Sequence, residues 1–319
     1  MPRAVVGGLL AVLALGLVAV PMFGNAFWVG LVMQIMIFGL LAISVDLMIR
    51  HVGLFPLCNG AFFAVAAYAV AMLEVQEGWP TALAVPAALA AAGLTGIIFG
   101  ISVRTGGVYF ILITLAFGQM VLSAATSWTA FTGGDNGITN VPYPSIAGFG
   151  PERLSQMYAL VLIVVAAATA LYARLVTSLF GLTLNGIRDS ESRMIALGYR
   201  TVLRKYVAFV VSSLIAGLAG VLYAYANQFV SPAAASLVVS VEAGLMAILG
   251  GSGTLIGPFI GAAVIMGIRN VVSAVVPGWP ILMGLVFIAV VLFLPRGLVS
   301  LGTMRGRRRG AAEPRTPSQ

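Results

Sequence analysis

The sequence predicts an all-α integral membrane protein, a polytopic bundle of eight to ten transmembrane helices, some of them short or interrupted. Of the 319 residues, 61% are hydrophobic and 8% are charged, and the mean hydropathy is +1.07. A soluble domain carries about 25% charged residues, so this chain has too few to cover a globule of its size. The apolar runs do not alternate with polar residues, unlike the strands of a membrane β-barrel.

Ten apolar runs define the predicted spans, because a bilayer core of ~30 Å needs about 20 helical residues. They cover residues 4–20, 29–49, 53–73, 82–102, 108–128, 158–176, 206–230, 241–250, 255–276 and 280–294. The runs at 241–250 and 280–294 are short, which is typical of half-helices or re-entrant segments. The first run also resembles a signal peptide, but its length and the lack of a good cleavage site favour a retained helix.

The basic residues predict the orientation, since Lys and Arg concentrate at cytoplasmic helix ends. With ten spans they fall on one face, apart from Arg153 and Arg269, and both termini are then cytoplasmic. The net charge of +8 would also suit nucleic-acid binding. The positions of the arginines favour topological anchoring instead, including the run at 305–309. We therefore expect no nucleic-acid partner.

One transmembrane domain is predicted over residues 1–304, followed by a basic, disordered cytoplasmic tail at 305–319. Two hydrophilic segments interrupt the membrane pattern. The outer loop at 129–157 is rich in Gly and Pro, which predicts a compact irregular structure. The inner segment at 178–205 is the more regular of the two.

Within the inner segment, a short amphipathic helix is predicted over residues 187–197, opened by Gly186 and stopped by Gly198. Charged residues at i,i+4 and i,i+3 spacing suit helical ion pairs, namely Asp189 with Arg193 and Arg188 with Glu191. A short helix between two spans either lies on the membrane surface or docks on a cytoplasmic protein, and the residues alone do not decide between the two.

The sequence lacks the residues of an enzyme, so a non-catalytic chain without a cofactor or metal is expected. It has one histidine, His51, and one cysteine, Cys58, with no spacing typical of metal ligands. There is no nucleophile elbow. Lys205 is the only lysine and does not belong to a phosphate-binding loop, so any ATP-driven work requires another subunit.

The charged residues within the spans disfavour an ion-coupled transporter, although they do not exclude one. Such transporters keep ionisable residues deep in the membrane, whereas Asp46, Glu74 and Glu242 lie toward span ends. Polar residues and Gly-Pro interruptions within spans are candidates for a solute path, or for close helix packing through small residues. The candidates are Asn59, Thr114, Gln119, Glu242, Gly250, Gly251, Gly257 and Pro258.

An ordered series of motifs resembles the permease subunits of branched-chain amino acid ABC importers, in particular their LivM-like half. The series consists of Gly53-x7-Ala61-Phe62-Phe63-x4-Tyr68, Val108-Tyr109-Phe110-x3-Thr114-Leu115-Ala116-Phe117-Gly118, Thr132-Gly133-Gly134-x2-Gly137-Ile138, Ile187-Arg188-Asp189-Ser190-Glu191 with Ala196-Leu197-Gly198, Ser231-Pro232, Leu249-Gly250-Gly251-Ser252-Gly253-Thr254-Leu255-x-Gly257-Pro258 and Leu294-Pro295-Arg296-Gly297-Leu298. Each motif is weak alone, but their order extends over residues 30–300.

The resemblance implies import of a branched-chain amino acid or a related small polar solute into the cytoplasm by alternating access. It implies a second homologous permease, two ATPases that hold ATP and Mg²⁺, a periplasmic or lipid-anchored solute-binding protein, and a bacterial inner membrane. The cytoplasmic segment from Gly186 to Gly198 then becomes the coupling element, with Arg188, Asp189, Glu191 and Arg193 among its residues.

The sequence departs from the family pattern at Leu54, Pro56 and Asn59, where relatives often carry Gln, Ser and His. The cargo is therefore open between a branched-chain amino acid and urea, an amide or an aromatic acid. Two other classes of function also remain: a secondary transporter or channel that works without ATP, and an intramembrane enzyme. The enzyme is disfavoured by the missing catalytic residues.

Overall fold

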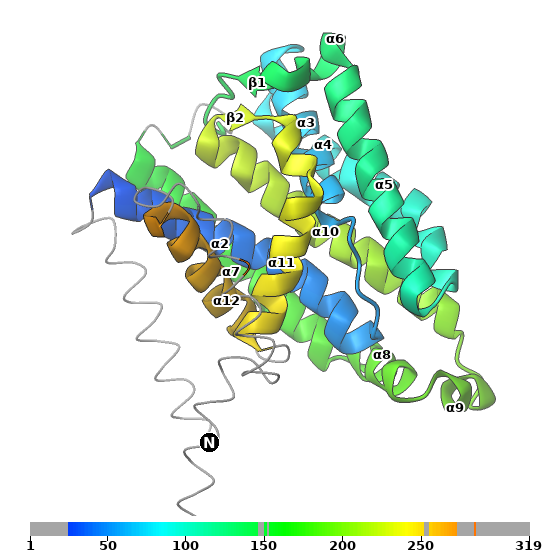
Figure 1. Ribbon diagram of the computed structural model, residues 1–319. Coiled ribbons are helices and arrows are strands. Elements are labelled where there is room, and N and C mark those ends of the chain that lie inside the picture. The colour runs from blue at the N-terminus through cyan, green and yellow to red at the C-terminus, as the bar shows by residue number, and fades with distance from the viewer. Residues whose placement is uncertain (1–24, 146–149, 152, 252–254, 273–283, 285–319) are drawn as a thin grey trace, which may run out of the picture.

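The computed structural model describes residues 25–145, 150–151, 153–251, 255–272 and 284. The predicted spans at 4–20 and, apart from residue 284, at 280–294 lie outside these residues, as does the tail at 305–319. The described part is a helical bundle (Figure 1), which confirms the all-α polytopic fold. Five of its helices are long and apolar enough to cross a membrane.

The first half of the bundle contains α2 (Ala26–Asp46), which continues as a π-helical turn η1 (Leu47–Val52), and then α3 (Asn59–Val75). Next come α4 (Thr81–Phe99) with the 3-10 turn η2 (Gly100–Arg104), and α5 (Gly107–Ser127). The predicted span at 53–73 is corrected here, because its first part is not helical. Gly53 has φ +79 and ends the preceding helix, and Pro56 has no N–H for a helical hydrogen bond.

The outer loop contains α6 (Thr129–Thr132), the 3-10 turn η3 (Gly134–Asn136) and β1 (Ile138–Thr139). β1 pairs antiparallel with β2 (Phe229–Val230), and Ile138 lies opposite Val230. Gly137 precedes β1 with φ +67, and a Cβ there would lie 2.1 Å from the Val230 carbonyl oxygen, so only glycine fits. The pairing ties the outer loop to the end of α10 (Figure 1).

The second half begins with α7 (Leu154–Thr177), whose first turn lies within the loop predicted at 129–157. It is followed by α8 (Leu179–Asp189), α9 (Glu191–Ala196) and α10 (Thr201–Asn227). After β2 come the 3-10 turn η4 (Pro232–Ala235), α11 (Leu237–Gly250), α12 (Gly257–Gly267) and the π-helical turn η5 (Ile268–Val272).

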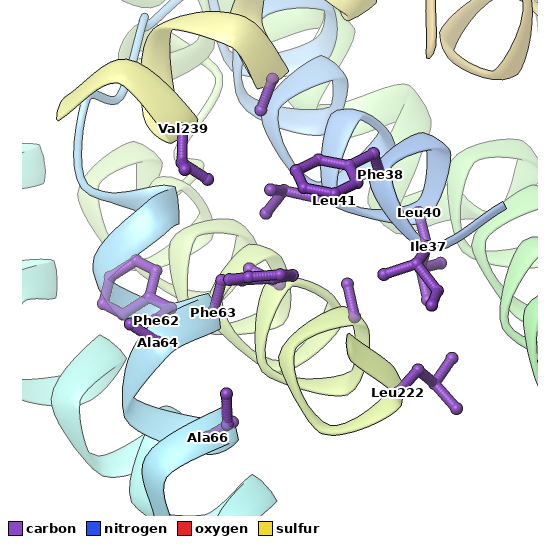
Figure 2. Packing of buried hydrophobic residues seen from close by; sticks show 14 of the residues in the cluster. Ile37, Phe38, Leu40, Leu41, Phe62, Phe63, Ala64, Ala66, Leu222 and Val239 are labelled. Carbon is purple, nitrogen blue, oxygen red and sulfur yellow. The ribbon is translucent and has the colours of Figure 1, made fainter. Parts of the chain in front are cut away.

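The core lies where α3 and α10 pack between α2 and α4. Figure 2 shows Phe62 and Phe63 of α3 with Phe38 and Leu41 of α2 across from them. The most apolar window is 61% buried in α2 and α10, but only 22% in α5 and 17% in α7. The exposed apolar side chains on α5 and α7 therefore face lipid or another subunit, because exposing so much apolar surface to water would be energetically unfavourable.

Candidate functional site

The chain is irregular between η1 and α3, inside the helical bundle. Irregular backbone within a membrane bundle is tolerated only if protein surrounds it or it lines a cavity. Leu54, Pro56 and Cys58 are buried there. The backbone N–H of Leu54 donates to the Met48 carbonyl at 3.1 Å. In Figure 1 this segment rises from the lower end of α2 to the start of α3 in the middle of the bundle.

α5 supplies the next hydrogen bond to this break. Thr114 is fully buried, and its Oγ1 accepts from the Leu57 N–H at 3.1 Å while donating to the Phe110 carbonyl at 2.9 Å. Gly118 lies one turn further on, and a Cβ there would lie 3.2 Å from the Leu57 carbonyl oxygen. Thr114 thus lies at the break. Gln119 is exposed, about 140° further around α5, so it is not brought to the same place.

Asn59 opens α3 and joins three helices. Its Nδ2 donates to Ser44 Oγ of α2 at 2.7 Å and to Ser212 Oγ of α10 at 3.0 Å. Ser212 Oγ in turn donates to the Ser44 carbonyl at 2.7 Å. Asn59 has no exposed surface, and no donor within the described residues reaches its Oδ1. This amide therefore fixes where α3 starts and leaves one buried acceptor unused.

The first turn of α11 meets the first turn of α3. The Gly60 N–H donates to Ser240 Oγ at 2.9 Å, and a Cβ on Gly60 would lie 2.7 Å from that oxygen. Gly244, one turn later on α11, packs against the ring of Phe55 in the break. Two helix N-termini, each with a partial positive charge, thus face each other inside the bundle. Ser44 and Ser240 were missed by the sequence reasoning, because a lone serine in an apolar run gives no signal of its partner.

The described part of the Gly-Pro cluster lies at the end of α11 and the start of α12. A Cβ on Gly250 would lie 1.7 Å from the Gly257 carbonyl oxygen, and Gly251 has φ +99. Gly250, Gly257 and Pro258 are buried. Gly250 lies ten residues beyond Ser240 on α11, or ~15 Å along the helix. The predicted path residues therefore separate into Asn59 and Thr114 at the break, and a distant glycine cluster where two helices pack closely.

The acids within the spans have partners toward the ends of helices. Glu242 Oε2 accepts from Arg269 Nη1 at 3.2 Å, which joins α11 to η5. Asp46 Oδ2 accepts from the Tyr172 hydroxyl at 3.1 Å, and Glu74 Oε1 accepts from the Tyr225 hydroxyl at 2.6 Å. Glu242 thus takes part in an ion pair and is not at the Asn59 site.

The inner segment holds two short helices rather than the single one predicted over 187–197. α8 already contains Gly186, and the chain breaks at Ser190, whose backbone is extended with φ −164. The predicted pairs of Asp189 with Arg193 and of Arg188 with Glu191 span this break, so they do not share a helix face. α8 begins before the predicted start at residue 187. Its buried residues, Gly181, Leu184 and Ile187, recur every three positions and form one apolar face of the helix.

α8 is hydrogen-bonded to the inner end of α2. Arg188 Nη1 donates to the Arg50 carbonyl at 2.6 Å. His51 Nδ1 donates to Asn185 Oδ1 at 2.8 Å, because a carboxamide oxygen only accepts. The aliphatic part of Arg188 also packs on Gly53, where a Cβ would lie 3.3 Å from its Cγ. These contacts hold α8 against the residues that lead directly into the break.

α9 is held on the start of α10. Glu191 Oε2 lies 2.7 Å from Lys205 Nζ. Partial burial opposes ionisation of Glu191, but the hydrogen bond and positive charge of Lys205 prevail and lower the pKa of the carboxyl. Gly198 ends the segment with φ +84, and Gly186 packs against the Met194 side chain. Asp189 and Arg193 are exposed.

The described helices and the broken start of α3 define a polytopic α-helical membrane protein with one irregular segment inside its bundle. Residues 27–294 match the family described as branched-chain amino acid transport system / permease component. The match covers most of the chain, so the chain belongs to this family and is a membrane transport permease. This confirms the resemblance drawn from the motifs.

Two similar curated proteins are named high-affinity branched-chain amino acid transport system permease protein LivM, from Salmonella typhimurium (strain LT2) and Escherichia coli (strain K12). Each is 26% identical over 290 residues, which cover 83% of this chain and 68% of the relative. No solved structure matches the chain significantly.

Proposed function

We propose that this permease is the translocating subunit of an ABC importer. It carries a branched-chain amino acid or a related small zwitterionic solute into the cytoplasm by alternating access. The names of the relatives support the class of cargo. The observation that carries the coupling part is the attachment of α8 to the inner end of α2 by Arg188 and His51.

This attachment offers a short mechanical route. A partner ATPase that moves the segment from Gly186 to Gly198 pulls on Arg50 and His51 through α8. Gly53, next in the chain, has the backbone freedom to act as a hinge, since its φ is +79 and its surface is exposed. The motion then reaches the break and Asn59. A two-state element whose equilibrium both sites bias is the physical basis for coupling between distant sites.

The solute route passes the meeting point of α3 and α11 in this proposal. Asn59 and Ser240 have at most 1% exposed surface, so the conformation described is closed there. Separation of the two helix starts would free their N–H groups and the Asn59 amide. Such groups suit the carboxylate of an amino acid, because half-helix N-termini carry positive potential. The contact residues Ser44, Thr114 and Ser212 would surround this opening.

The proposed assembly contains three further kinds of protein, and lipid surrounds its membrane part. A second homologous permease completes the membrane part, and two cytoplasmic ATPases hold ATP and Mg²⁺. A periplasmic or lipid-anchored protein delivers the solute. The chain lies in a bacterial inner membrane with both termini cytoplasmic, in accordance with the distribution of its arginines.

The test is purification of the tagged chain from its native membrane, followed by reconstitution of the recovered complex into liposomes. We expect ATPases and a second permease to co-purify, and solute uptake to require both ATP and the binding protein. Branched-chain amino acids, urea, short amides and aromatic acids serve as competing solutes. Solute flux through the isolated chain, with no co-purifying ATPase, would establish the ATP-independent transporter or channel instead.

A further inference from the structure

A cavity of about 410 Å³ lies between the start of α8 and the start of α10, at the end of the bundle that carries the coupling segment. Its lining residues are Phe180, Gly198, Tyr199, Arg200, Leu203, Arg204 and Val207. The function proposed above assigns no role to it. Its volume falls within the range of small-ligand sites, which is roughly 300–1,000 Å³.

The cavity is positively charged, and none of its lining residues is acidic. Arg200 and Arg204 are its charged residues. Within the described residues, neither arginine forms a salt bridge. Glu191, the acid of the adjoining α9, is already paired with Lys205. A ligand of this cavity therefore carries negative charge, and the planar guanidinium fork favours a phosphate or a carboxylate.

Arg204 is held in place for such a ligand. Its guanidinium carbon lies 5.7 Å from the centroid of the Phe180 ring. Cation–π contact with a ring face leaves the in-plane N–H donors free. Arg204 is half-buried, whereas Arg200 is exposed. The pair thus combines a half-buried charge that contacts Phe180 with a solvent-exposed one.

The rest of the cavity is apolar and continues along a membrane helix. Leu203, Arg204 and Val207 line the cavity from the first two turns of α10, with Leu203 and Val207 on one face at i and i+4, and Arg200 is the residue that immediately precedes the helix. Leu203 is 51% exposed and Val207 40%, and Leu214 continues the same face with 39%. α10 is long and apolar enough to span the membrane. A ligand seated here meets arginines at one end and lipid-facing side chains at the other.

We propose that this cavity binds an anionic phospholipid of the cytoplasmic leaflet. The phosphate contacts Arg200 and Arg204, and an acyl chain lies along Leu203 and Val207. Basic pockets between membrane helices on the cytoplasmic side are suited to anionic head groups. The site adjoins Gly198 and the α9–α10 connection, so the bound lipid also supports the coupling segment. The site does not depend on the ATP-driven function, since it requires only the bundle in its membrane.

The test uses the full chain in detergent and in nanodiscs of phosphatidylcholine with or without phosphatidylglycerol. Native mass spectrometry measures the phosphatidylglycerol retained, and the midpoint of thermal unfolding measures stabilisation. We expect Arg204→Gln and Arg200→Gln each to weaken retention about tenfold, the effect of losing one charge-assisted contact. Arg104→Gln is the matched control, because Arg104 is an exposed arginine outside the lining.

Two further measurements test the proposal even if an arginine variant folds poorly. Val207→Trp fills the apolar end without removing charge, and we expect it to reduce retention as well. Glycerol phosphate, which has no acyl chain, is expected to give no stabilisation. Equal retention by all variants, or full stabilisation by glycerol phosphate, would refute the proposal. Loss of a co-purifying ATPase in Arg204→Gln with lipid retention unchanged would identify a protein-docking surface instead.

Discussion

The guanidinium of Arg188 lies 2.6 Å from the backbone carbonyl oxygen of Arg50, a residue 138 positions earlier in the chain. The bond joins α8 of the inner segment to the last turn before the break in the third span. Because the acceptor is a backbone group, no substitution at Arg50 removes it, and Arg188 is the partner to test.

Arg188→Leu is expected to reduce ATP-driven uptake about tenfold while ATP hydrolysis continues. The physical reason is loss of the contact through which α8 moves the end of α2, and allosteric couplings are typically worth 5–150-fold. The measurement is uptake per ATP hydrolysed in liposomes that contain the complete complex. Arg174→Leu is the control, since Arg174 is also exposed but lies in the last turn of α7. Equal uptake by the Arg188 and Arg174 variants would contradict the route.

Reversal of the ion pair between Glu191 and Lys205 tests the docking of α9. Glu191→Arg places two positive charges together, so we expect α9 to leave α10 and uptake to uncouple from ATP hydrolysis. The chain still inserts, because membrane helices are unchanged. The double variant Glu191→Lys with Lys205→Glu restores the attraction and should recover most of the uptake. No recovery would show that Glu191 acts through a different contact.

The same pair predicts a dependence on pH. Lys205 lowers the pKa of Glu191 in the folded chain, so the stabilisation is present above the ordinary carboxyl range, about 4.3. It is lost as pH falls through the lowered folded-state pKa. Spin labels on α9 and α10 should therefore separate only in strong acid. Glu191→Gln should separate to the same extent at every pH, and a pH response that persists in this variant would exclude the pair as its source.

Substitutions at Gly198 separate backbone strain from side-chain size. The backbone φ is +84, and nothing lies within 4 Å of a Cβ built there. Gly198→Asn is expected to be tolerated, because Asn visits the left-handed region readily. Gly198→Pro fixes φ near −65° and should displace the start of α10, lowering uptake. Thermal unfolding of both variants distinguishes a local change from general misfolding. Equal uptake by both variants would show that coupling does not require the left-handed backbone at Gly198.

Gly250→Ala tests whether the glycine cluster packs helices or lines a path. A Cβ at Gly250 would meet the Gly257 carbonyl at 1.7 Å, so α11 and α12 must move apart and the midpoint of unfolding should fall. Overpacking costs about 1–3 kcal/mol. Gly30→Ala is the control, since nothing lies within 4 Å of a Cβ there. If Gly250→Ala left the midpoint of unfolding unchanged but altered the solute preference, Gly250 would be assigned to the solute path instead.

The class of architecture follows from the amino-acid composition and the lengths of the apolar runs, because these set the cost of exposing the chain to water. The break after Gly53 was predicted as part of one span over 53–73, although the φ preference of glycine and the missing N–H of Pro56 are local properties that explain it. The end of the inner segment's last helix before Gly198 is likewise explained by the φ preference of a glycine. The hydrophilic composition located the inner segment at 178–205, and the family motifs then implied its coupling role.

Which polar groups meet depends on how the helices pack in three dimensions. The Asn59 amide hydrogen-bonds Ser44 and Ser212, which lie 15 and 153 residues away in the sequence. Glu191 forms its ion pair with Lys205, although Arg188 is nearer in the sequence. The i,i+3 rule failed there because it assumes one continuous helix, and the chain breaks at Ser190. Buried hydrogen bonds and close glycine contacts are selected by the packing of whole helices, so no local pattern in the sequence contains them.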